Sequence, residues 1–176
     1  MRIKWFSLIR ITGLLLVLLY HFFQTVFPGG FFGVDVFFTF SGFLITSLLL
    51  EEFEQKGKID ILGFFRRRFY RIFPPVVLMV LVVMPFTFLV RQDYVAGIGG
   101  QIAGVLGFMT NFYEMLTGGS YESQFIPHLF VHNWSLAVEV HYYVLWGLAV
   151  WFLAKRAKTT GQLRGMIFLL SSLTFL

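Results

Sequence analysis

Long apolar stretches alternate with short polar segments along the chain. Most of these stretches approach or exceed the 18 or so residues that a helix needs to cross a bilayer. We expect four membrane-spanning helices, over about residues 8–27, 32–50, 74–90 and 134–154. A fifth apolar run opens at Met166 and is still open at Leu176. The expected fold class is therefore all-α integral membrane, a polytopic helical bundle with four to five transmembrane helices in this chain.

Turn residues and prolines give the expected ends of these helices. Pro28-Gly29-Gly30 is a strong turn signal that ends the first helix. The polar segment at residues 51–60 is expected to be a loop. Pro74-Pro75 is expected to open the third helix, because first-turn amides lack helical partners anyway, and Pro85 is expected to kink it.

The positions of the charges predict the topology. Residues 95–113 are uncharged and long enough to span, but they contain five glycines. If they do not span, one side of the membrane holds every lysine and arginine except Arg91. The positive-inside rule makes that side cytoplasmic. We therefore predict that residues 95–113 form an interfacial or re-entrant helix, in a multi-pass protein of the cell membrane with a cytoplasmic N-terminus.

Composition excludes several classes of protein. The chain is 57% hydrophobic and 13% charged, and the charged fraction is about half that of a soluble domain. The net charge of +5 does not indicate nucleic-acid binding, because the basic residues are sorted to one side. The chain has no cysteine and hence no disulfide, thiolate ligand or thiol nucleophile. We also expect no metal site.

The first helix carries two residues that hydrocarbon should exclude. Arg10 and His21 are eleven residues apart, so they share one helix face about 16 Å apart along the axis. An arginine at membrane depth costs on the order of 3 kcal/mol and usually faces protein or water. The alternative is that Arg10 extends to the cytoplasmic headgroups and His21 is a hydrogen-bonded packing residue.

Polar residues of the other helices complete a candidate site. His21 is expected about 9 Å inside the outer end of the first helix, and Asp35 in the first turn of the second helix. Glu139 is expected about 7 Å below the outer start of the fourth helix. An imidazole and two carboxylates would thus meet in the outer half of the bundle. Arg10 would share the cytoplasmic boundary with a cluster suited to a polyanion, formed by Arg66, Arg67, Arg68 and Arg71.

Simpler interpretations of the same residues remain open. The arginine run could set the topology and bind anionic lipid headgroups. Asp35 could be a helix-terminus carboxylate favoured by the helix dipole. Its helix also has a polar or small stripe, which should pack against another helix or line a cavity and comprises Asp35, Thr39, Gly42 and Thr46.

Four ordered segments resemble the membrane acyltransferase family 3. They are Arg10 with His21, GVDVFFTFSGFLI at 33–45, RRRFYRIFPP at 66–75, and NWSLAVEVHYYVLW at 133–146. The resemblance implies a domain of roughly ten helices, of which residues 1–176 would be the N-terminal part. The sequence is most similar to the peptidoglycan O-acetyltransferases of Gram-positive bacteria, many of which continue into an extracellular hydrolase-like domain.

The resemblance also implies an activity. Family members move an acyl group, commonly acetyl from acetyl-CoA, to a hydroxyl of a cell-surface glycan or another acceptor. Their functional residues correspond here to Arg10, His21 and Glu139. The family often has E-E-Q-F-Y where this chain has Glu139-Val140-His141-Tyr142-Tyr143, which leaves His141 as an unexplained polar group.

These observations give a mechanism as a hypothesis. A neutral imidazole, with an unperturbed pKa of about 6.5, suits the removal of a proton from a sugar hydroxyl, so His21 is the expected base. Asp35 or Glu139 would orient it. Arg10 and the four clustered arginines would hold the phosphates of coenzyme A. Contacts to substrate are expected from Trp134, Ser135 and Tyr142.

The expected partners follow from this mechanism. They are the lipid bilayer, a coenzyme A thioester, a cell-wall glycan acceptor and the remaining helices of the domain, with no nucleic acid. The alternative function is a proton-coupled transporter or flippase of an anionic lipid or glycolipid, in which the same acidic and histidine side chains would relay protons.

Overall fold

The computed structural model describes residues 5–89, 95–117 and 128–173, in which all regular secondary structure is helical. The helices of ten residues or more are α1 (Trp5–Phe22), α2 (Gly33–Lys56), α3 (Ile61–Val83), α6 (Trp134–Ala154) and α7 (Thr160–Leu173). Within the described residues, three continuous segments are long and apolar enough to cross a membrane: Pro28–Lys56, Ile61–Leu89 and Val131–Ala154. A shorter apolar helix lies at Leu8–Phe22. These features confirm an all-α, multi-pass membrane fold.

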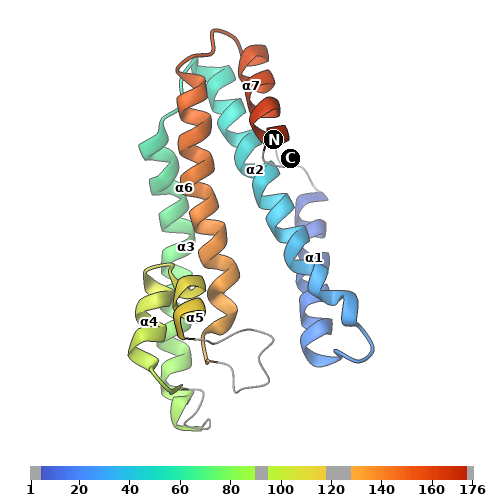
Figure 1. Ribbon diagram of the computed structural model, residues 1–176, viewed down its shortest axis with the longest axis vertical. Coiled ribbons are helices and arrows are strands. Elements are labelled where there is room, and N and C mark those ends of the chain that lie inside the picture. The colour runs from blue at the N-terminus through green and yellow to red at the C-terminus, as the bar shows by residue number, and fades with distance from the viewer. Residues whose placement is uncertain (1–4, 90–94, 118–127, 174–176) are drawn as a thin grey trace.

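The long helices α2, α3 and α6 run along the length of the molecule (Figure 1). The two short helices α4 (Ile98–Leu106) and α5 (Thr110–Thr117) lie at one end, beside α3 and α6. At the other end, α7 turns back and packs against α2 and α6. Helix α1 lies against α2, on the side away from α3. Residues of α1, α2, α3 and α6 line one cavity, where the candidate site lies.

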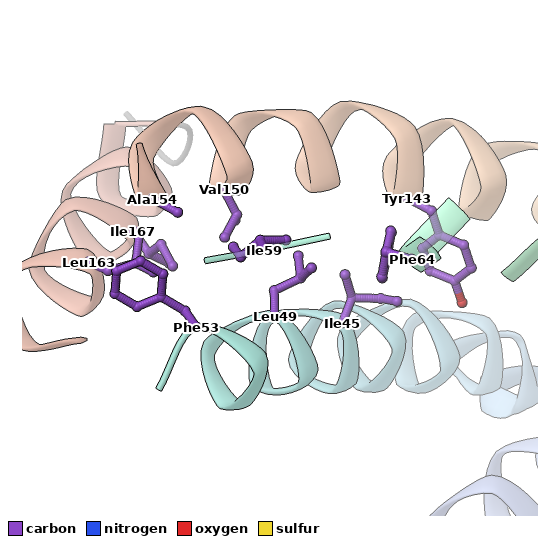
Figure 2. Packing of buried hydrophobic residues seen from close by; sticks show 10 residues of the cluster. All are labelled: Ile45, Leu49, Phe53, Ile59, Phe64, Tyr143, Val150, Ala154, Leu163 and Ile167. Atoms are coloured by element: carbon purple, nitrogen blue, oxygen red, sulfur yellow. The ribbon is translucent and has the colours of Figure 1, made fainter. Parts of the chain in front are cut away.

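Two apolar clusters hold these helices together. The larger one joins α2, α3, α6 and α7 near the end where α7 turns back (Figure 2). Ile45, Leu49, Val150 and Leu163 are fully buried in it. The smaller cluster lies around the short helices and consists of Val76, Val80, Val105 and Phe130. Since α3 and α6 are anchored at both ends, the side chains between the two clusters are held in place.

Glycines allow α1 to approach its neighbours closely. A Cβ at Gly33 would lie 2.6 Å from the carbonyl oxygen of Gly13. A Cβ at Gly30, in the 3₁₀ helix η1 (Pro28–Phe32), would overlap the carbonyl oxygen of Leu16. Neither position leaves room for a side chain, so the position of α1 depends on glycine at these two points.

The second helix is longer than the sequence predicted. It continues to Lys56, so the expected loop over residues 51–60 is wrong for residues 51–56, and only residues 57–60 connect α2 to α3. Lys56 Nζ bonds Glu52 Oε1 at 3.0 Å one turn earlier. The helix ends at Gly57, whose φ of +66° is the left-handed conformation that glycine adopts without strain. Charged residues here extend the helix by pairing along its surface rather than ending it.

The third helix also starts earlier than predicted. It begins at Ile61, with Asp60 as the N-cap, whose carboxylate accepts a bond from the Gly63 amide at 3.0 Å. Pro74 and Pro75 lie inside the helix rather than at its start, so that prediction is wrong. Prolines are tolerated inside membrane helices, because neighbouring helices and side chains can satisfy the backbone carbonyl groups that proline leaves without a donor. At Pro85 the α-helix has given way to a 3₁₀ helix, η2 (Met84–Leu89), and the expected kink there stays a prediction.

The end of the first helix and the segment at residues 95–113 also differ from the prediction. Helix α1 ends at Phe22 rather than near residue 27, and a turn precedes Pro28. Residues 95–113 do not form one helix: α4 and α5 are separated at Gly107 and Phe108, and Phe108 has a φ of +54°. Neither short helix is long enough to span, in agreement with the prediction that this segment does not cross as a single helix.

Candidate functional site

Glu139 is the centre of a hydrogen-bonded group in the middle of the bundle. It lies on α6, and its Oε1 accepts a bond from Tyr143 Oη one turn further along the same helix. The same oxygen accepts a bond from Ser41 Oγ on α2. The Tyr143 and Ser41 hydroxyl oxygens are 3.4 Å apart. The carboxylate therefore connects the two helices through buried hydroxyl groups, which stabilise its charge.

Arginines line the cavity next to this group. The cavity has a volume of about 380 Å³, and we call it the arginine cavity. Its lining consists of apolar side chains together with Ser41, Glu139, Tyr143, Arg10, Arg68 and Arg71. The Arg68 Cζ lies 5.6 Å from the Tyr143 ring centroid, and the Arg10 Cζ lies 5.6 Å from the Phe40 ring centroid. Aromatic rings thus hold two of the three guanidinium groups in cation–π geometry.

A second cavity leads from the arginines toward the α2–α3 connection. It has a volume of about 400 Å³ and is lined by the last two turns of α2 and by Arg67, Arg68 and Arg71; we call it the loop-end cavity. Arg67 Nη2 pairs with Glu52 Oε2 at 3.3 Å, and both residues line this cavity. Because Arg68 and Arg71 line both cavities, the two spaces are adjacent. Arg66 has an exposed side chain.

A third cavity lies on the other side of the Ser41–Glu139 pair. It has a volume of about 570 Å³, and Ile167 and Ser171 of α7 form one wall, so we call it the α7-side cavity. Thr39, Gly42 and Thr46 line it, which confirms that this part of the small and polar stripe on α2 faces a cavity. Across from the stripe, Trp146 Nε1 donates to Thr46 Oγ1 at 2.8 Å, and the Tyr142 ring stacks on Trp146.

His21 lies near the end of α1 that approaches η1. Its Nδ1 lies 2.7 Å from the Val17 carbonyl oxygen. Its ring packs edge-on against the ring of His132, with 5.0 Å between centroids. A carbonyl oxygen can only accept a hydrogen bond, so Nδ1 carries the proton in the neutral ring and Nε2 is the basic nitrogen.

The grouping of these residues differs from the predicted one. His132 lies in the short 3₁₀ helix η4 (Val131–Asn133), just before α6, and precedes Glu139 by seven residues. His21 therefore lies beside a part of the chain about two turns away from the carboxylate. Asp35 has an exposed side chain and does not line any of the three cavities. Glu139 instead shares a cavity with Arg10, which the sequence analysis placed at the opposite end of the site.

Comparison with known proteins identifies the family. A model of the acyltransferase 3 family, described as an acyltransferase domain, matches residues 3–176. The chain belongs to the acyltransferase 3 family. It is 35% identical over 142 residues to the O-acetyltransferase OatA of Staphylococcus aureus strains NCTC 8325 and COL. The match covers 81% of this chain and 24% of those proteins, so the chain spans about a quarter of their length. No solved structure matches the chain.

The remaining predicted site residues lie at the start of α6 or along it. The Trp134 ring packs edge-on against Phe38 of α2. Ser135 Oγ donates to the His132 carbonyl oxygen at 3.3 Å, which is a local bond at the helix start. Tyr142 lines the α7-side cavity. His141, whose role the sequence did not explain, packs its ring against Phe112 of α5, with 5.4 Å between the ring centroids.

A buried polar group on α5 was not predicted from the sequence. Glu114 on α5 has an exposed fraction of 6%, and its Oε2 lies 2.9 Å from His128 Nδ1. Its other oxygen, Glu114 Oε1, is buried and has no hydrogen-bond partner in the part of the chain that the structure describes, and the same holds for Thr110 Oγ1 and Asn111 Oδ1. The available signal was a carboxylate immediately after an uncharged helical stretch, with Thr110 four residues earlier on the same face.

Proposed function

We propose that the full-length protein is a membrane O-acetyltransferase, which moves an acetyl group from cytoplasmic acetyl-CoA to a hydroxyl of an extracellular cell-wall glycan, peptidoglycan. Membership of the acyltransferase 3 family and the O-acetyltransferase relatives support this activity. The structural observation that carries it is the arginine cavity, in which three guanidinium groups face a hydrogen-bonded glutamate.

The arginines suit an anionic thioester donor. A guanidinium group binds phosphate oxygens through two parallel hydrogen bonds, and it keeps its charge in an apolar setting. Arg68 and Arg71 line both the arginine cavity and the loop-end cavity. They can therefore hold the phosphates of coenzyme A in one space while its uncharged thioester arm extends into the other. Coenzyme A supplies the acyl group in activated, thioester-linked form. Arg67 adds a third cation on the loop-end side.

His21 suits the role of base for the acceptor. The Val17 carbonyl fixes the proton of the neutral ring on Nδ1, so Nε2 can take the proton of a sugar hydroxyl. The positive-inside rule puts the α2–α3 connection and the N-terminus in the cytoplasm, and His21 then lies toward the outer leaflet. Donor and acceptor would approach from opposite sides of the membrane, and further helices and an extracellular hydrolase-like domain would present the glycan.

The proposal is tested with full-length protein in membranes, given labelled acetyl-CoA and isolated cell-wall glycan. We expect labelled glycan ester and an equal amount of free coenzyme A. Arg68→Ala should raise the KM for acetyl-CoA strongly. Arg164→Ala is the matched control, because Arg164 pairs with Glu54 on the surface and both side chains are about 60% exposed. Label that crosses the membrane without forming an ester would refute the proposal and identify a transporter instead.

A further inference from the structure

The Ser41 hydroxyl is bonded differently from most hydroxyl groups on the membrane helices. Serine and threonine in such helices commonly donate to a carbonyl of the preceding turn, which satisfies the hydroxyl without any function. Among the described residues, this bond is made at 2.7–3.0 Å by Thr12, Thr46, Thr87, Ser171 and Ser172, among others. Ser41 instead donates to a carboxylate on another helix, 98 residues away in the chain.

The partners of Ser41 form the arrangement of an activated nucleophile. A hydroxyl becomes nucleophilic when an adjacent base takes its proton, and the base must itself be oriented by a third group. Here Glu139 is the base within hydrogen-bond reach of Ser41, and the Tyr143 hydroxyl holds the same carboxylate in place. The Arg68 guanidinium lies over the Tyr143 ring and lines the same cavity, where its charge can stabilise an oxyanion.

Ser41 and Glu139 also lie between two cavities. Both line the arginine cavity and both line the α7-side cavity. The two cavities otherwise differ in charge, because three arginines line the first, whereas the described residues that line the second are uncharged apart from Glu139. Only 7% of the Ser41 surface is exposed, so an ester formed there would be sheltered from water. A group attached to Ser41 can therefore be delivered from one cavity and removed from the other.

We propose that Ser41 is a covalent acyl carrier, which receives the acyl group in the arginine cavity and releases it to the acceptor. This inference rests on the proposed acyl-transfer function. Glu139 takes the Ser41 proton while Ser41 Oγ attacks the carbonyl carbon of an acyl thioester. The carbon–sulfur bond breaks, and the thiolate leaves as a thiol with the proton held by Glu139. The acceptor hydroxyl then attacks the ester carbonyl, the carbon–Oγ bond breaks, and the acceptor's proton returns to Ser41 Oγ.

The carrier step is tested in full-length protein given labelled acetyl-CoA with no acceptor. We expect one acetyl group per chain, found on the Ser41 peptide by mass spectrometry, and release of that label when glycan is added. Ser41→Ala should lose both the label and the transfer. Ser41→Cys should retain the label as a thioester, which neutral hydroxylamine cleaves much faster than an oxygen ester. Ser47→Ala on the same helix is the control and should label as the unchanged protein does.

The outcomes separate this inference from the proposed function. Glycan acetylation by the unchanged protein with no label on Ser41, or at an equal rate in Ser41→Ala, would overturn the carrier step and leave the acetyltransferase proposal standing. A labelled Ser41 without glycan product would support the carrier and overturn the proposed acceptor. If neither label nor product forms, both proposals are wrong. Retained label in Ser41→Cys shows that the variants fold, so loss in Ser41→Ala then reports the nucleophile.

Discussion

Replacing Gly33 with alanine tests whether the close contact between α1 and α2 holds α1, with its functional residues, in position. The added Cβ would lie 2.6 Å from the Gly13 carbonyl oxygen and 2.8 Å from Val17 Cγ2. The closest favourable carbon–oxygen contacts are about 3.3 Å, so α1 and α2 must separate by about 0.7 Å or bend locally. Overpacking of this kind costs about 1–3 kcal/mol. The shift also moves Arg10, which lies on α1 and lines the arginine cavity.

The assay for Gly33→Ala combines thermal unfolding of the full-length protein in detergent with acetyl transfer. We expect a lower midpoint of unfolding and a raised KM for acetyl-CoA, because the first helix carries one of the cavity arginines. Gly29→Ala is the matched control in the adjoining turn, since a Cβ at Gly29 would meet no atom within 4 Å. Equal stability and equal transfer in the two variants would refute the view that close glycine contact holds α1 in position.

Three further substitutions test single residues. Glu139→Gln keeps an oxygen that can accept the two hydrogen bonds but removes the base; transfer should fall by about 10²–10⁴-fold with an unchanged elution profile on size exclusion, and unchanged transfer would exclude the base role. His21→Ala should abolish glycan acetylation while the protein still inserts and binds coenzyme A, and retained activity would rule out His21 as the acceptor's base. Glu114→Ala leaves His128 without its buried partner and should lower the free energy of unfolding by about 1–3 kcal/mol in a denaturant or thermal titration, whereas an unchanged midpoint would show that the pair is structurally neutral.

Helix positions were predictable from sequence where apolar length decides them. The predicted fourth span, residues 134–154, coincides with α6, because its boundaries are an apolar run with Lys155 and Arg156 after it. Boundaries that depend on capping and surface pairing were not predicted. Charged residues at the end of α2 form a helical turn that Gly57 ends, and Asp60 caps α3 well before the prolines. Apolar content alone does not distinguish a polar helical turn from a loop.

Some residues of the candidate site stand out in the sequence, but the way they are grouped does not. Glu139 and the arginines stand out as charges in apolar helices, which sequence makes visible. Their relative depth was estimated by assuming that the helices start at a common outer plane. In the structure η4 (Val131–Asn133) and the short helices cover the start of α6, and Glu139 shares a level with Ser41, eight residues into α2. Helical periodicity gives the depth of a residue only relative to the end of its own helix. It does not give the relative depth of residues on different helices, so the contact between Ser41 and Glu139 could not be predicted from the sequence.

Only four residues join α2 to α3, from Gly57 to Asp60. Asp60 caps α3, so it fixes the residue at which that helix begins. The angular placement of Arg67, Arg68 and Arg71 is therefore set by their spacing from Asp60, independently of the surrounding lipid. One residue inserted between Asp60 and Arg67 would turn all three guanidinium groups by roughly 100° while leaving the composition of the segment almost unchanged. Relatives that share the chemistry are thus expected to preserve the length of this interval more strictly than its amino-acid identities.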